Sequence, residues 1–336
     1  MNRKPHVAVV GATGAVGIEM IKTLEKRSFP VGKLTLLASA RSVGKKLKYR
    51  GEEITVKELK KDSFAGIDLA LFSAGGSISK EFAPIAARAG CVVIDNSSAF
   101  RMDDKVPLVI PEVNAEDIRK HQGIIASPNC STTQMVVAVK PLPDAARVRR
   151  IVVSTYQATS GAGLVGSRDL EQGSHAHLHQ QPYQYECFPY PIAFNCIPQI
   201  GSPKERGYTS EEMKMVYETR KMLHDDSIQV CATCVRVPVS NCHSESVLVE
   251  TERKVSVEEA KRLLAAMPGV VVMDDLAKKI YPTPMHCDRR DEVFVGRIRE
   301  DLSSPNGLAF WCVSDNLRKG AATNAVQIAE WMVANC

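Results

Sequence analysis

The pattern of apolar and polar positions divides the chain into two stretches that predict different secondary structure. Over residues 1–131, short apolar runs alternate with helical patterns, which predicts a parallel sheet covered by helices. The predicted strands are His6–Val10, Leu34–Ala38, Leu69–Ser73, Cys91–Asp95 and Gly123–Ala126, and the predicted helices are Ala15–Lys26, Ser79–Ala89 and Ser131–Lys140. We expect Pro141 and Pro143 to end the last of these helices.

The pattern changes after Arg150. Strand-like segments rich in β-branched residues occur at Ile151–Gln157, Gln229–Val237 and Ser246–Thr251. Helical patterns lie between them at Arg168–Gly173 and Glu211–His224, and Pro182–Pro203 has the composition of an irregular connection. This half predicts an antiparallel or mixed sheet with helices on one side. An amphipathic helix is expected at Gly320–Val333.

Length and charge limit the class of protein. A chain of 336 residues usually forms more than one core, so two domains are expected. The apolar fraction of 44% and charged fraction of 24% are those of an ordinary globular protein. The net charge of +5 is spread along the chain without a basic stripe, which argues against a nucleic-acid partner and suits a small anionic substrate.

The cysteines and the apolar runs indicate a compartment. The basic N-terminus leads directly into a strand with no apolar signal region, and no apolar run reaches membrane-spanning length. Ten cysteines are scattered through apolar segments, as is typical of reduced, buried thiols. We therefore expect a cytoplasmic protein with no membrane segment.

Gly11, Gly14 and Gly17 follow the first predicted strand and open the first helix. Glycines at this spacing let the backbone turn tightly and approach a pyrophosphate, which the helix N-terminus stabilises. A tight turn without a ligand is the alternative. The second strand ends in Ser39, Arg41 and Ser42 with no acid before Glu52, which favours NADP over NAD unless this is simply a solvated basic loop.

Cys130 lies at the junction between a short strand and a helix, within Ser127–Thr133. Backbone N–H groups and the helix dipole stabilise a thiolate at such a position, which predicts a nucleophile rather than a buried apolar thiol. The same N–H groups and the Asn129 amide could form an oxyanion hole. His243, expected in a loop between two strands, is the best candidate base, although a structural loop histidine is equally compatible with its spacing.

Five motifs, in order along the whole chain, resemble the aspartate-semialdehyde dehydrogenase family. They are Gly11–Gly17, Ser127–Thr133, Tyr156–Gly163, Arg236–Val239 with His243–Glu245, and Asp315–Ala322. The resemblance implies an α/β fold with a Rossmann-type domain at 1–131 and an α+β catalytic and dimerisation domain at 132–315. It further implies that a terminal helix within 316–336 packs back on the first domain, and that the protein is a homodimer.

The resemblance also implies roles for single residues. Cys130 would carry the acyl thioester, His243 would be the general acid/base, and Gln157, Arg236 and Glu211 would bind the substrate. Lys214 and Arg101 would bind phosphate. The implied cofactor contacts are Gly11, Thr13, Gly14, Ala15, Val16, Ser39, Arg41, Ser42, Ser160, Gly161 and Asn316. From the residues alone, a solvated helix face is the preferred interpretation of Glu211 and Lys214, and Arg236 could equally form a structural ion pair.

Three features depart from the family pattern or remain outside it. Cys242 stands where a small residue such as glycine is common, and we interpret it as a tolerated small residue. The alternating His175, His177 and His179 suggest a metal site, but a polar surface segment without a metal is the preferred interpretation. Cys231 and Cys234 would point to opposite faces of a strand, which argues against a zinc or redox pair.

The implied reaction is the NADPH-dependent reduction of L-4-aspartyl phosphate to L-aspartate 4-semialdehyde, with release of phosphate. It serves the synthesis of lysine, diaminopimelate, methionine, threonine and isoleucine. Two alternatives stay open: an N-acetyl-γ-glutamyl-phosphate reductase, and a non-catalytic NADP-sensing module. Glu211, Lys214 and Arg236 argue against the first, and the presence of both Cys130 and His243 argues against the second.

Overall fold

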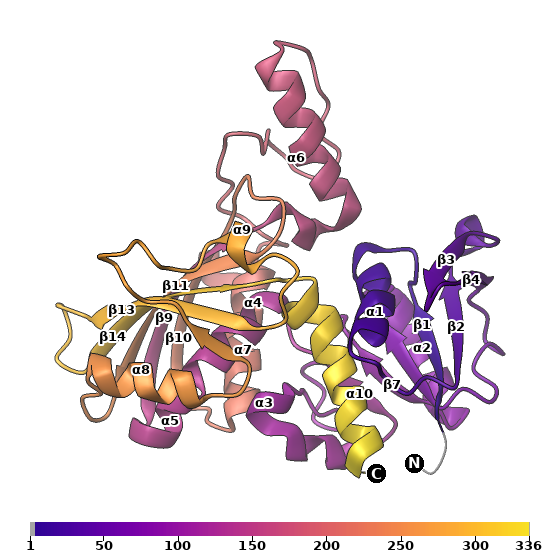
Figure 1. Cartoon of the computed structure of the whole chain (residues 1–336), viewed down its shortest axis with the longest axis horizontal. Coiled ribbons are helices and arrows are strands. Elements are labelled where there is room, and N and C mark those ends of the chain that lie inside the picture. The colour runs from indigo at the N-terminus through magenta and orange to yellow at the C-terminus, as the bar shows by residue number, and fades with distance from the viewer. Residues whose placement is uncertain (1–3, 336) are drawn as a thin grey trace. The chain divides into compact units, whose positions relative to one another are not determined.

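The computed structural model describes residues 4–335, which form two compact units (Figure 1). One unit comprises residues 4–129 and 321–335, and the other is Cys130–Gly320. The chain passes from one unit to the other between residues 129 and 130 and returns between residues 320 and 321. The boundaries expected from the sequence were 131/132 and 315/316. Residues 1–3 and 336, which those ranges included, lie outside the described part of the chain.

The first unit is built on a parallel sheet. Its strands, in spatial order, are β5 (Lys57–Glu58), β2 (Lys33–Ala38), β1 (His6–Val10), β6 (Leu69–Phe72), β7 (Val92–Asp95) and β8 (Ile124–Ala126). The parallel sheet that the sequence pattern predicted is thereby confirmed. A polar antiparallel hairpin of β3 (Lys46–Tyr49) and β4 (Glu52–Thr55) was not predicted.

The first unit has two hydrophobic cores, and alternate side chains of β1 contribute to each of them. Val7 and Val9 pack with α1 (Ala15–Lys26) and α10 (Thr323–Asn335), whereas Ala8 and Val10 pack with α2 (Gly76–Arg88). Because successive side chains of a strand point to opposite faces, helices cover the sheet on both sides. The terminal helix therefore belongs to the first unit, and a π-helical turn at Arg318–Ala322 precedes it.

The second unit contains the predicted mixed sheet. Its spatial order is β10 (Gln229–Arg236), β9 (Val148–Gln157), β11 (His243–Thr251), β14 (Gly307–Ser314), β13 (Val293–Glu300) and β12 (Val270–Val272). β9 runs parallel to β10 and antiparallel to β11. Together with the first unit this confirms the α/β fold class.

Helices of the second unit pack on the sheet face that carries the buried side chains. They include α4 (Cys130–Val139), α7 (Ser210–Leu223) and α8 (Val257–Ala266). The prediction that Pro141 ends the helical stretch was incomplete, because Pro141 starts a second short helix, α5 (Pro141–Ala146). Proline suits the first turn of a helix, where its missing N–H has no partner to lose.

Helix α6 (Gly163–Leu178) is much longer than the predicted Arg168–Gly173. In Figure 1 it extends away from the mixed sheet of its own unit, with the irregular chain that follows it folding back alongside. Its low hydrophobicity explains why the sequence pattern missed most of it. The prediction that His243 lies in a loop was wrong, since it is the first residue of β11.

Candidate active site

The glycine-rich turn of the first unit leaves no room for side chains. Gly11 has φ +84°, and a Cβ added there would collide with the carbonyl of Ser73. A Cβ on Gly17 would collide with the Gly11 carbonyl. Because the turn leads directly into the N-terminus of α1, its backbone N–H groups are available to an anionic group, as a dinucleotide phosphate requires.

The other cofactor candidates of this unit follow the adjacent strands β1 and β2. Thr13, Gly14, Ala15 and Val16 form the turn and the start of α1, and the Thr13 hydroxyl lies 3.2 Å from that of Ser42. Ser39 and Arg41 are exposed in and beside the short 3-10 helix Ala40–Ser42. The carboxyl ends of two neighbouring parallel strands therefore carry the predicted phosphate-binding turn and an exposed guanidinium, which together fit a dinucleotide.

Cys130 is the first residue of α4 and is partly exposed. A Cβ placed on Gly320 would lie 2.7 Å from the Cys130 Cβ, so any side chain at position 320 would displace the cysteine. The α4 N-terminus places backbone N–H groups and the positive end of the helix dipole at the thiol.

His243 is fully buried at the start of β11. The Ala158 N–H donates to its Nδ1 at 3.0 Å, so in the neutral ring the proton is on Nε2. Burial, and next the positive charge of Arg236, lower the pKa of His243 to about 3. The resting side chain is therefore a neutral imidazole whose Nε2–H is a hydrogen-bond donor.

Arg236 connects the candidate groups of the second unit. It is 6% exposed at the end of β10, and its Nη1 donates to the Ala158 carbonyl at 2.6 Å. Burial lowers the pKa of Arg236, while the neighbouring Cys130 and Glu211 act in the opposite direction. A guanidinium remains charged under these conditions, so a positive group stands near the thiol.

Gln157, Glu211 and Lys214 form a continuous chain of hydrogen bonds. The Gln157 amide donates to Glu211 at 3.2 Å, and the Lys214 ammonium lies 2.9 Å from the other Glu211 oxygen. Glu211 is only 6% exposed, so the alternative of a solvated helix face is wrong for this residue. The Gln157 Nε2 also lies 3.5 Å from His243 Nε2; both atoms carry hydrogens, so this places the amide beside the imidazole without a hydrogen bond between them.

Ser160, Gly161 and Asn316 gather beside these groups. The Asn316 amide donates to the Ser160 hydroxyl at 3.0 Å, and its carbonyl oxygen accepts from the Cys242 N–H. A Cβ on Gly161 would lie 2.9 Å from Arg236 Nη1 and 3.1 Å from His243 Nε2. Gly161 thus leaves open the space that the guanidinium and the imidazole both border.

Two further predicted residues, Arg101 and Asn129, belong to the first unit. Arg101 is 7% exposed and donates to the carbonyls of Ser127, at 2.9 Å, and Asn96, at 2.7 Å. Asn129 is buried and directly precedes Cys130. Two of the Arg101 donors are therefore occupied by the backbone of its own unit.

Sequence reasoning missed several residues that hold this site. Ala158 binds both His243 and Arg236 through its backbone, and such a contact has no side-chain signature in a sequence. Gln134, one turn into α4, donates to the His243 carbonyl at 3.2 Å. Glu245 is fully buried two residues after His243, and burial raises its pKa well above the usual value. The Phe188 ring lies 6.0 Å from the Arg236 guanidinium.

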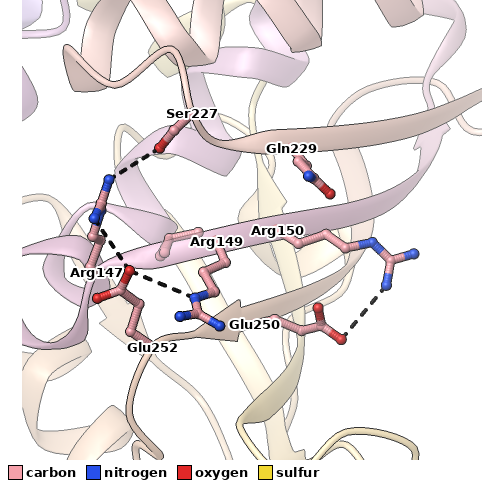
Figure 2. Close-up of a pocket in the computed structure, with 8 residues that line it drawn as sticks. Arg147, Arg149, Arg150, Ser227, Gln229, Glu250 and Glu252 are labelled. Carbon is pink, nitrogen blue, oxygen red and sulfur yellow. Dashed lines mark hydrogen bonds and ion pairs between the residues drawn. The ribbon is translucent and has the colours of Figure 1, made fainter.

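A separate pocket of about 350 Å³ lies at the opposite end of β9 (Figure 2). Arg147, Arg149 and Arg150 line it with Glu250 and Glu252, and each arginine has a carboxylate within 4 Å. Gln157 is seven residues after Arg150 along this extended strand, a distance of roughly 23 Å. The residues lining this pocket include no cysteine or histidine, the Ser227 hydroxyl is hydrogen-bonded to Asp225 and Arg147, and the charges are largely compensated.

Cys242 lies in a small polar group next to His243. Its thiol and the carboxylates of Asp288 and Asp315 have ligand atoms within 4.8 Å of one another. Asp315 already accepts hydrogen bonds from Asn241, Arg289, Leu317 and Arg318. The carboxylate is thus satisfied by the protein itself. On β10, Cys231 is exposed and Cys234 buried, as expected for opposite faces of a strand.

Comparisons with known proteins agree with this arrangement. Residues 6–121 match a family model described as the NAD binding domain of semialdehyde dehydrogenase, and residues 139–319 match its dimerisation domain. The fold and these matches define a nicotinamide-dependent oxidoreductase.

Individual relatives narrow the family. An aspartate-semialdehyde dehydrogenase of Aquifex aeolicus is 57% identical, and one of Bacillus subtilis is 52% identical, each alignment covering 98% of both chains. The crystal structure of aspartate semialdehyde dehydrogenase II from Vibrio cholerae complexed with ASA superposes with a TM-score of 0.97 at 47% identity, covering 99% of each chain. The chain belongs to the aspartate-semialdehyde dehydrogenase family.

A more distant structure carries a cofactor. The aspartate semialdehyde dehydrogenase from Candida albicans with NADP is 26% identical, with a TM-score of 0.76 over 98% of this chain and 99% of that one. The dimerisation-domain match supports a homodimer. No helix among the described residues is long and apolar enough to cross a membrane.

Proposed function

We propose that this protein reduces L-4-aspartyl phosphate to L-aspartate 4-semialdehyde with NADPH, through a thioester on Cys130. The observation that carries the proposal is the position of Arg236, which borders Cys130, Glu211 and the His243 ring in one unit. A nucleophile, a proton donor and a carboxylate-binding group are thereby collected around one small space.

Cys130 forms the covalent intermediate. Its thiolate attacks the acyl carbon of the substrate, the new C–S bond forms, and phosphate leaves with the electrons of the C–O bond. The α4 N-terminus and the charge of Arg236 support the thiolate without a neighbouring base. Because Nε2 of resting His243 already carries a proton, the neutral ring begins the reaction as a hydrogen-bond donor to the substrate oxygen rather than as a base that deprotonates Cys130.

His243 then serves the oxygen of each tetrahedral intermediate. Its Nε2–H donates to the oxygen as negative charge develops, and the N–H groups at the start of α4, with the Asn129 amide, share that charge. The neutral ring can take part over a wide pH range, because its pKa is lowered to about 3.

The remaining side chains orient the substrate. Arg236 would bind the α-carboxylate, Glu211 the ammonium group, and Gln157 the acyl group. Lys214 and Arg101 would bind the phosphate before it leaves. Glu211, which is already bonded to Gln157 and Lys214, would couple the ammonium site to the other two.

The first unit carries the groups that suit the phosphates of NADPH, and three further candidate cofactor contacts belong to the second unit. The turn Gly11–Val16 suits the pyrophosphate, and Ser39, Arg41 and Ser42 suit a 2′-phosphate, while Ser160, Gly161 and Asn316 border the reacting groups. When bound, the nicotinamide supplies the hydride that reduces the thioester to the aldehyde. The same cofactor is bound in the Candida albicans relative.

We further propose a cytoplasmic homodimer that serves lysine, diaminopimelate, methionine, threonine and isoleucine synthesis. The described cysteines are unpaired with one another, which suits a reducing compartment.

The test is an assay of the purified protein with L-aspartate 4-semialdehyde, phosphate and NADP⁺, followed by the absorbance of NADPH. N-acetyl-glutamate 5-semialdehyde in the same assay is the matched control. Turnover of the first aldehyde alone supports the proposal. Turnover of the acetylated aldehyde would mean an acetylglutamyl-phosphate reductase, and NADP binding without turnover of either would mean a non-catalytic module.

A further inference from the structure

We propose that His175 and His179, at the C-terminal end of α6, form a two-imidazole chelate for a divalent transition-metal ion such as Zn²⁺, Ni²⁺ or Cu²⁺. This inference does not depend on the proposed catalytic function, because neither residue takes part in it.

The helix brings the two rings together. His175 and His179 are four residues apart, so they lie on the same side of α6 one turn from each other. Their ring centroids are 4.1 Å apart and the ring planes differ by 22°, so the rings are stacked and one of them must turn about its side-chain bonds for both to bind one ion. Both side chains are exposed, and an ion can reach them. Two histidines at this spacing on one helix face are the arrangement by which helical zinc sites present their ligands.

A hydrogen bond prepares one ring for coordination. His179 Nδ1 lies 2.8 Å from the carbonyl oxygen of His175. A carbonyl can only accept, so Nδ1 carries the proton and the lone pair is on Nε2. Metal-binding histidines commonly donate their second N–H in this way, which fixes both tautomer and ring orientation.

The surroundings favour a cation. Glu171, a further four residues back on the same helix face, is exposed and adds negative charge to that face. The site also lies at the C-terminus of a 16-residue helix, where the dipole attracts positive charge. His177 does not share this position, because its ring contacts Phe194 at 5.0 Å.

The preference for a metal ion follows from the ligands. Neutral imidazole binds Zn²⁺, Ni²⁺ and Cu²⁺ well and Mg²⁺ or Ca²⁺ poorly. With two side-chain nitrogens and solvent completing the shell, binding is exchangeable. A bound ion would join the last turn of α6 to the residue that ends it and so oppose fraying there.

The test uses tag-free protein and titration calorimetry with NiCl₂ on the wild type and on three variants, His175→Gln, His179→Gln and His177→Gln. Loss of one chelating nitrogen is expected to weaken Ni²⁺ binding by at least roughly tenfold. His177→Gln, on the same helix but facing Phe194, is the matched control and should bind like the wild type. Exposed thiols such as Cys196 and Cys231 contribute equally to all four proteins.

Hydrogen exchange supplies a second measurement. Ni²⁺ should slow amide exchange in the last turn of α6 in the wild type and in His177→Gln, but not in the other two variants. Equal Ni²⁺ affinity in all four proteins, or equal losses in all three variants, would overturn the proposal.

Discussion

Ala158 carries two contacts on which the candidate site depends. Its N–H donates to His243 Nδ1 and its carbonyl accepts from Arg236, so one residue of backbone sets the tautomer of the imidazole and the place of the guanidinium. The bond to the charged arginine is worth roughly 1.5–3 kcal/mol. Neither contact could be predicted from the sequence, because alanine supplies only main-chain atoms that every residue has. Cys130 and His243 were predictable because their chemistry lies in the side chains.

His243→Asn should lower kcat by about 10²–10⁴-fold, the usual range for a positioned proton donor, with a smaller change in KM. The asparagine keeps a polar side chain of similar size but cannot donate from the position of Nε2. Steady-state kinetics at saturating NADP⁺ measure both constants. A strong rise in KM with an unchanged kcat would instead make His243 a substrate-binding residue.

Glu245→Gln should make the free energy of unfolding less sensitive to pH. Burial raises the pKa of Glu245 in the folded state well above its ordinary 4.5, so the folded state binds more protons than the unfolded chain above that pH. Wild-type stability must then fall as pH rises from about 4.5 toward the folded pKa, and a glutamine removes that loss.

Urea unfolding of both proteins at a series of pH values from 4.5 upward checks this prediction. The stability of Glu245→Gln relative to the wild type should increase with pH. A constant difference would show that Glu245 does not titrate in this range. Activity near neutral pH should be retained, since glutamine resembles the protonated acid.

At the scale of elements, the start of α4 is determined by its neighbour as well as by its own sequence. The Cys130 position at the helix N-terminus was predictable from the preceding strand and the apolar helix that follows. The close approach of Gly320 was not, because it joins residues far apart in the chain. Similarly, His175 and His179 looked like alternating residues of a polar segment until α6 placed them one turn apart.

Gly320→Ala should displace the nucleophile. An added Cβ would lie 3.1 Å from the Cys130 Cα and 2.7 Å from its Cβ, and because the second distance is shorter than real Cβ contacts, α4 must shift at its first residue. We expect a loss of about tenfold or more in kcat, since small misplacements of reacting groups are costly. The rate of Cys130 alkylation by iodoacetamide, measured with the melting temperature, checks the cause. An unchanged alkylation rate and unchanged kcat would show that the site accommodates the methyl group.

Arg41→Ala tests whether the short 3-10 helix Ala40–Ser42 recognises the 2′-phosphate of the cofactor. A guanidinium bonded to a phosphate contributes roughly 1.5–3 kcal/mol, or about ten- to a hundredfold in affinity. The affinity for NADPH should therefore fall by about ten- to a hundredfold, whereas the affinity for NADH, which has no 2′-phosphate, should hardly change. The values of kcat/KM for both cofactors must be measured at one ionic strength, because salt screens exposed charges. Equal losses for both would mean that Arg41 supports the loop.

For the whole molecule, the two-part fold was predictable because each sheet type leaves its own pattern. Buried parallel strands such as β1 form continuous apolar runs, while the second unit has β-branched strands that alternate in burial. The hairpin β3–β4 escaped prediction because its strands are short and charged, and β12 because it has only three residues. β13 and β14 were missed although they are long. Glycine and charged residues interrupt β13, whereas β14 is a nearly continuous apolar run without alternation.

The most direct test of the covalent mechanism compares the wild type with Cys130→Ser in the assay with L-aspartate 4-semialdehyde, phosphate and NADP⁺. A hydroxyl at this position is not ionised, so the serine protein should fold and bind NADPH while its rate of NADPH formation falls by on the order of 10³-fold or more. Cys242→Ser, a buried thiol next to His243, is the matched control and should retain turnover. Substantial NADPH formation by Cys130→Ser would contradict a thioester on Cys130.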